Sequence, residues 1–167
     1  MKLFRVLLCV VLVLAVLPLS ACAEKPRDLE AEVHMPQETR NSTPEEAVRS
    51  YLDWVTFAFR TMDSEVATPT MTPDEASRIS YYITMNRAED KILNQRLDSF
   101  EIRSVDISDQ VALVAATEEW TYNHKSVAKG TFDEPIQVSY EATYTVLSFD
   151  GVWRVQSVEA TRLEPEQ

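Results

Sequence analysis

A histidine and a glutamate on one predicted strand are the first residues whose spacing could support acid–base chemistry. His124 and Glu118 are six residues apart in the stretch 111–124, which is rich in β-branched and aromatic residues. By alternation they share one strand face with Trp120 and Tyr122. A carboxylate and an imidazole can serve as general base and acid, but six residues of strand span about 20 Å. An exposed strand-end histidine and a solvated or rim carboxylate are the simpler interpretation, and we assign no catalytic residue.

Metal ligands and phosphate-binding loops are scarce in this chain. The histidines are His34 and His124, the cysteines are Cys9 and Cys22, and no zinc or EF-hand calcium spacing occurs. With only two glycines, the sequence has neither G-x-G-x-x-G nor a Walker-type loop. The formal net charge of −11 repels nucleic acid. We therefore expect no metal, no cofactor and no nucleic-acid partner.

The amino-terminal residues predict export. Lys2 and Arg5 precede an apolar run over residues 6–17, and small residues follow it. A helix that crosses a membrane needs roughly 20 apolar residues, so this run is too short for a permanent span. A charged start, a brief apolar run and small residues at its end are typical of a secretory signal peptide.

Cys22 is the residue with the clearest chemical role. The run Leu19-Ser20-Ala21-Cys22 resembles the bacterial lipobox. This resemblance implies that the Cys22 thiol receives a diacylglycerol and that cleavage falls between Ala21 and Cys22. An ordinary signal peptide remains the alternative, because Ala21-Cys22-Ala23 also fits the small-x-small rule. The lipobox implies an exported protein, held by lipid on Cys22 to the cell membrane, or to the outer membrane if the host has one.

The remaining chain suits a single tethered domain. Removal of residues 1–21 leaves 146 residues and, because Lys2 and Arg5 leave with them, a net charge of −13. Residues 22–42 are polar, contain two prolines and have no apolar period, which predicts a flexible tether. We expect the folded domain over 43–163 and a short tail over 164–167.

Two similar cap motifs predict where helices begin. Thr43-Pro44-Glu45-Glu46 has the N-cap, the first-turn proline and the acid of a capping box, and apolar residues follow at helical spacing up to Met62. Residues 66–71 are interpreted as a connection. Thr72-Pro73-Asp74-Glu75 repeats the cap signal, and we expect two helices, or one kinked helix, between Pro73 and Leu97.

The last part of the chain changes to the period of strands. Strands are predicted over 99–107, 111–124, 136–149 and 152–160, with Asp150-Gly151 as a strong hairpin signal. The predicted fold class is therefore α+β, with amino-terminal helices packed on one side of a curved antiparallel sheet of about four strands.

This order of elements resembles the nuclear transport factor two-like superfamily. The helix opening T-P-E-E-A-V-R-S-Y-L (43–52) and the closing D-G-V-W-R-V (150–155) carry the resemblance. It implies a cone of bent sheet whose open side is filled by helices. Enzymes of this fold place an acid or a histidine with a tyrosine inside the cone. The residues that the resemblance makes candidates for lining such a cavity are Tyr82, Glu118, Trp120, Tyr122, Tyr140 and Tyr144.

The resemblance leaves several functions open, because the superfamily contains isomerases, dehydratases and polyketide cyclases as well as non-catalytic modules. The lack of a catalytic set favours a lipid-anchored, non-catalytic binding or assembly module, whose partner is an envelope protein or a small ligand. The alternative is an isomerase- or dehydratase-type enzyme that uses Glu118 with a cavity tyrosine. A core filled by aromatic residues would favour the module, and a deep pocket around a carboxylate would favour the enzyme.

Overall fold

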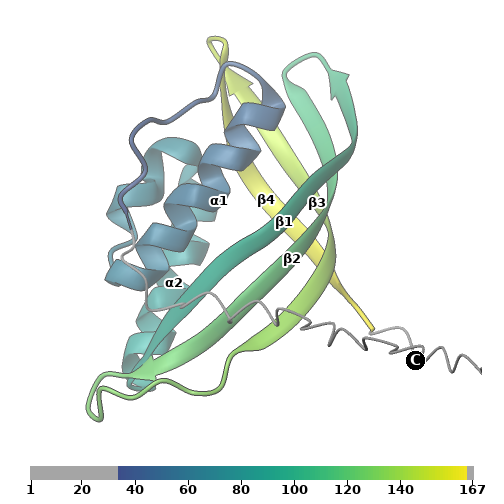
Figure 1. The fold of residues 1–167 in the computed structure, drawn as a ribbon. Helices are drawn as coiled ribbons and strands as arrows, with labels where there is room; N and C mark the ends of the chain where they lie inside the picture. Colours follow the sequence, from purple (N-terminus) through teal and green to yellow (C-terminus); the bar gives the residue numbers. More distant parts are fainter. Residues whose placement is uncertain (1–33, 165–167) are drawn as a thin grey trace, which may run out of the picture.

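The computed structural model describes residues 34–164, so the predicted signal peptide, Cys22 and most of the tether lie outside the described residues. The elements are α1 (Pro44–Thr61), a 3-10 helix η1 (Glu65–Thr70), α2 (Pro73–Ala88), β1 (Lys91–Ser108), β2 (Val111–Ser126), β3 (Ile136–Phe149) and β4 (Val152–Leu163). The four strands form an antiparallel meander, and both helices lie on one side of this curved sheet (Figure 1). The predicted α+β class is confirmed. In the part of the chain described, no helix is long and apolar enough to cross a membrane.

Both helices begin at the predicted caps. The Thr43 hydroxyl accepts a hydrogen bond from the Glu46 amide at 3.2 Å, and Thr72 accepts one from the Glu75 amide at 3.5 Å. Each cap is followed by a proline, whose missing N–H costs nothing in the first turn. The stretch 66–71, interpreted as a connection, is mostly the short helix η1.

The prediction of helix over residues 92–97 is wrong, because β1 begins at Lys91. Asp90 has a φ of 59°, a left-handed conformation that ends α2 and turns the chain directly into the strand. In the β1–β2 pair, Leu93 lies opposite His124 and Leu97 lies opposite Trp120. The polar Gln95 between them lies opposite Tyr122. Bulges follow Leu97 and Ile102 and shift which residues point inward. Because the inward Gln95 is polar and the two bulges change which residues point inward, the apolar residues of β1 do not show the period of two on which strand prediction depends.

The core lies between α1 and the inner face of the sheet. Its sheet side is built largely of small and β-branched residues, which let the helix approach closely: Ala112, Val114, Ala116, Ala142, Val146 and Val155. The β3–β4 turn has positive φ at both Asp150 (54°) and Gly151 (81°), as a tight hairpin turn of the primed type requires. Trp153, just after this turn, is half-buried and packs against the core.

The end of the predicted tether is bound to the domain. The Arg40 amide donates to the Ser50 hydroxyl at 2.7 Å, and that hydroxyl donates back to the Arg40 carbonyl at 2.8 Å. The Trp153 amide donates to the Asn41 carbonyl at 2.9 Å. Residues 34–42 run beside α1 before reversing into it (Figure 1). Arg40 and Asn41, which were predicted as part of the tether, are therefore joined to α1 and β4 by these bonds.

Candidate functional site

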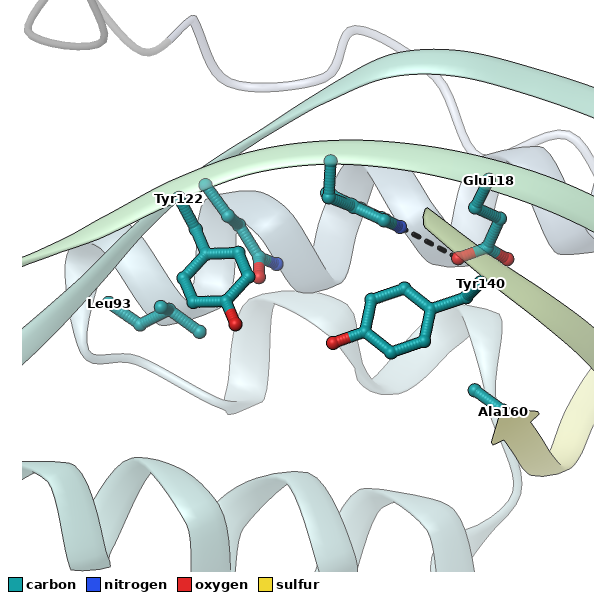
Figure 2. A pocket seen from close by; sticks show the side chains of 7 residues that line it. Leu93, Glu118, Tyr122, Tyr140 and Ala160 are labelled. Carbon is teal, nitrogen blue, oxygen red and sulfur yellow. Dashed lines mark hydrogen bonds between the residues drawn. The ribbon is translucent and has the colours of Figure 1, made fainter. Parts of the chain in front are cut away.

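A pocket of about 250 Å³ opens on the inner face of the sheet, and all four strands contribute to its lining (Figure 2). The register places Gln95 opposite Tyr122 and Glu118 opposite Tyr140. Inward positions on neighbouring strands are thus brought to one place. The lining residues are Leu93, Gln95, Glu118, Trp120, Tyr122, Tyr140 and Ala160.

Glu118 is a buried carboxylate in the wall of this pocket, with 5% of its surface exposed. Its Oε1 accepts a short hydrogen bond from the Tyr144 hydroxyl, and its Oε2 accepts one from the Trp120 Nε1 at 2.7 Å. Figure 2 shows the second of these bonds beside the ring of Tyr140. The expectation of a solvated or rim carboxylate is therefore wrong, because Glu118 occupies an inward position where the core supplies donors.

A second buried glutamate lies close behind the first. Glu75 on α2 is 2% exposed and accepts a hydrogen bond from the Tyr51 hydroxyl at 2.5 Å. The Tyr51 ring meets the Tyr144 ring edge-on, with centroids 6.2 Å apart. Two carboxylate–tyrosine pairs therefore adjoin in the core, one from the helices and one from the sheet.

The two glutamates differ in their ionic partners. Glu75 forms an ion pair with Arg78 on the same helix. Among residues 34–164, no cationic side chain forms an ion pair with Glu118. A buried carboxylate normally requires a cationic partner as well as hydrogen bonds, so this difference bears on what the pocket binds.

The tyrosines around Glu118 keep their protons. Burial, and then the negative charge of Glu118, raises the pKa of Tyr144. Burial, and then Glu75, raises the pKa of Tyr51 well above its usual value. Burial is also the largest cause of the raised pKa of Tyr140, and the neighbouring Tyr122 phenol adds to it. These hydroxyls therefore act as hydrogen-bond donors near neutral pH and not as bases.

The free energy of unfolding should fall as the pH rises above about 10. In the unfolded chain a tyrosine titrates near pH 10, whereas Tyr51 and Tyr144 have raised pKa values in the fold. The contribution of these two tyrosines to the free energy of unfolding is therefore fully present below pH 10. Above pH 10 it is lost by about 1.4 kcal/mol per pH unit for each residue. Urea unfolding from pH 8 to 11.5 measures this slope.

Single tyrosine variants separate the contributions to this alkaline loss. Tyr144→Phe should remove about half of the slope, because one of the two buried hydroxyls is gone. Tyr81→Phe is the matched control, since Tyr81 is exposed on α2, and its slope should equal that of the wild type. An unchanged slope in Tyr144→Phe would contradict the assignment.

The structure brings together four of the six predicted cavity residues. Glu118, Trp120, Tyr122 and Tyr140 line the pocket. Tyr144 is buried beneath it and reaches it only through its bond to Glu118.

Two aromatic candidates lie away from the pocket. Tyr82 does not line it and is 50% exposed, because α2 turns Ile79 and Ile83 toward the core instead. His124 is half-buried, contrary to the expectation of an exposed residue, and its ring meets that of Tyr122 edge-on at 6.5 Å. It is absent from the pocket lining, so the histidine–glutamate pair is not assembled there.

Three lining residues escaped the sequence analysis: Leu93, Gln95 and Ala160. Leu93 and Gln95 lie in the stretch predicted as helix, and the polar Gln95 between Leu93 and Leu97 leaves no apolar alternation that would indicate a strand there. Ala160 was predicted at the end of a strand, but nothing in a lone alanine indicates a pocket.

A larger hollow of about 420 Å³ lies between residues 36–40 and α1. Its lining includes Glu38 and Arg40, which pair with each other at 3.2 Å on the surface. These two charges are therefore paired with each other on the surface, whereas the Glu118 carboxylate of the first pocket is buried. In the part of the chain that the structure covers, no three His, Cys, Asp or Glu side chains are placed to hold a metal ion.

Comparisons of the fold find similar solved structures. The intermembrane space region of chloroplast protein ARC6 matches with a TM-score of 0.60 at 14% identity, over 75% of this chain and 99% of that one. An NTF2-like superfamily protein from Salmonella enterica matches with a TM-score of 0.53 at 10% identity, over 75% of this chain and 95% of that one. No protein-family model and no curated protein matches the sequence. At these identities the likeness shows the fold, which is the NTF2-like cone, and it assigns no activity.

Proposed function

We propose that this protein is a non-catalytic binding module, anchored outside the cytoplasm by lipid on Cys22, and that the pocket beside Glu118 holds a small ligand. One observation carries the choice of a module over an enzyme. Both oxygens of Glu118 already accept hydrogen bonds from buried core donors, Tyr144 and Trp120. The carboxylate is thereby fixed as part of a structural network.

The packing of the cone interior supports the same proposal. Tyr51 and Tyr144 pack edge to face, Trp120 is buried beside them, and α1 covers the sheet. The space that remains is about 250 Å³ and is partly lined by tyrosine hydroxyls. Ligand pockets for drug-sized molecules start near 300 Å³, so a smaller ligand is favoured.

Anchoring is supported by residues 19–22 and by the stretch that follows them. The lipobox resemblance predicts attachment at Cys22, and the domain begins to make contacts at Arg40. The 17 residues between Cys22 and Arg40 could extend to about 60 Å. This reach would hold the pocket clear of a lipid surface.

The enzyme remains the second candidate, because Glu118 and the hydroxyls of Tyr122 and Tyr140 line the same pocket. A carboxylate and a nearby hydroxyl can share proton transfer in an isomerase. Glu118→Gln discriminates between the two functions once a ligand is known. Loss of an acid–base group lowers turnover by about 10²- to 10⁴-fold, whereas a binding module has no turnover to lose.

Filling the pocket should abolish ligand binding. Ala160 lies on β4 at the pocket and is exposed, so Ala160→Trp should place an indole in the opening with little effect on folding. Fragments that bind the wild type, detected by ligand-observed NMR, should bind this variant at least about tenfold more weakly.

The neighbouring residue provides a matched control for this substitution. Thr161 follows Ala160 on β4 and is also exposed, but it does not line the pocket. Thr161→Trp should therefore bind fragments as the wild type does. If no fragment binds the wild type, or if Ala160→Trp binds all of them unchanged, the pocket is not the binding site.

A further inference from the structure

Within the part of the chain that the structure describes, the buried Glu118 carboxylate has neutral hydrogen-bond partners only. Tyr144 and Trp120 donate one hydrogen bond each to Glu118, and a carboxylate can accept about four. No Lys, Arg or His among the described residues forms an ion pair with Glu118, although Arg78 does so with Glu75. Among the described residues, the buried Glu75 therefore has a cationic partner, whereas the buried Glu118, which lines the pocket, has none.

The other walls of the pocket are largely aromatic. Trp120, Tyr122 and Tyr140 line it together with the aliphatic side chain of Leu93. In Figure 2 the rings of Tyr122 and Tyr140 lie on the same side of the pocket as Glu118, with their hydroxyls directed toward each other. The faces of indole and phenol rings attract organic cations, and Trp does so most strongly.

The charge of the whole chain acts in the same direction. The net charge is −11 over the full sequence, and it becomes −13 when residues 1–21 are removed. An acidic protein raises the local concentration of cations and lowers that of anions. A cationic ligand would therefore be favoured both at a distance and at the carboxylate.

We infer that the pocket binds a small organic cation, either a protonated primary amine or a quaternary ammonium ion. Its charge pairs with Glu118, and its alkyl groups contact Trp120, Tyr122 and Tyr140. This inference rests on the proposed function, because it names the ligand class for the same pocket. The bound cation is the positively charged partner of Glu118, as Arg78 is the positively charged partner of Glu75.

Matched pairs of cations and neutral isosteres test the charge directly. Choline and 3,3-dimethyl-1-butanol have the same shape apart from the charged nitrogen, and protonated pentylamine and pentan-1-ol have the same number and arrangement of heavy atoms. Titration calorimetry at pH 7, with tryptophan fluorescence as a second readout, should give at least about tenfold tighter binding of one cation than of its isostere.

Substitution of Glu118 should remove this preference. Glu118→Gln keeps the shape and should reduce affinity for the cation by at least about tenfold, while affinity for the isostere changes less than about threefold. Glu119→Gln is the matched control, because Glu119 is the next residue on β2 and is exposed. Both variants lose one negative charge, so a difference between them reports the pocket and not the net charge.

A second variant keeps the test valid if Glu118→Gln fails to fold. Tyr140→Leu replaces a half-buried ring by an aliphatic chain and leaves the Glu118 hydrogen bonds in place. It should weaken binding of the cation more than binding of the isostere, because only the cation is attracted to the ring quadrupole.

The outcomes separate this inference from the proposed function. If cations and isosteres bind equally, and Ala160→Trp blocks both, the binding function stands and the preference for cations is refuted. If neither class nor any other fragment binds, both proposals fail. If cations bind equally well to Ala160→Trp, they sit elsewhere on the acidic surface and the inference is overturned.

Discussion

Cys22→Ala should abolish lipid labelling of the protein completely. The lipobox resemblance makes the Cys22 thiol the attachment point, and alanine offers no sulfur for a thioether. In cells fed radiolabelled palmitate, we expect label on the wild type and none on the variant. After fractionation, the variant should be soluble or should retain its uncut amino-terminal segment.

The second cysteine of the chain is the control for this experiment. Cys9 lies within the apolar run of the predicted signal peptide, so Cys9→Ala should be labelled and anchored like the wild type. Lipid labelling that survives Cys22→Ala, or membrane association of a variant whose amino-terminal segment has been cut off, would contradict the anchor. An unlabelled wild type that is cut after Ala23 would instead establish the ordinary signal peptide.

Tyr144→Ala should cost about 3–5 kcal/mol of unfolding free energy. Tyr144 is 1% exposed, packs on Tyr51 and holds Glu118 through its hydroxyl. The substitution leaves a cavity and removes one of the two donors that stabilise a buried carboxylate. Single domains are stable by about 5–15 kcal/mol, so this loss is a large share. Urea unfolding monitored by circular dichroism measures it.

Two further variants separate the ring from the hydroxyl. Tyr144→Phe keeps the ring and should cost about 1–3 kcal/mol, because Glu118 loses its donor. Thr143→Val changes the exposed neighbour on β3 and should stay within about 0.5 kcal/mol of the wild type. A neutral Tyr144→Phe would mean that the hydroxyl of Tyr144 contributes nothing to holding Glu118.

Local signals predicted the elements that local chemistry determines. The caps at Thr43 and Thr72 are set within four residues of sequence, and both helices begin there. The Asp150-Gly151 turn is likewise a two-residue signal, because both positions need positive φ. The start of β1 could not be predicted in this way. Its inward Gln95 is polar because it faces a pocket, and a pocket is a property of the whole sheet.

For the site, the sequence could predict only which residues share one face of a strand. Alternation placed Glu118 with Trp120 on one face of β2, and both lie inward as expected from it. Whether that face is covered by helix depends on how far α1 extends over the sheet, and alternation carries no information on this. One hydrogen-bond donor to Glu118 is Tyr144, 26 residues later and on another strand, so alternation within β2 carries no information on it. Tyr82 was misplaced because α2 has few apolar residues to define its inner face.

The hydrogen bonds of Arg40 and Asn41 also determine how the domain would bear mechanical load. If lipid on Cys22 holds the protein, a pull on the domain arrives first at the Arg40–Ser50 and Asn41–Trp153 bonds. One leads to α1 and the other to β4, so the force is shared between the helical layer and the sheet before it reaches the first turn of α1. Detachment of residues 40–42 would lengthen the tether by up to about 10 Å. The attached segment would thus detach under load before the helices that cover the sheet are displaced.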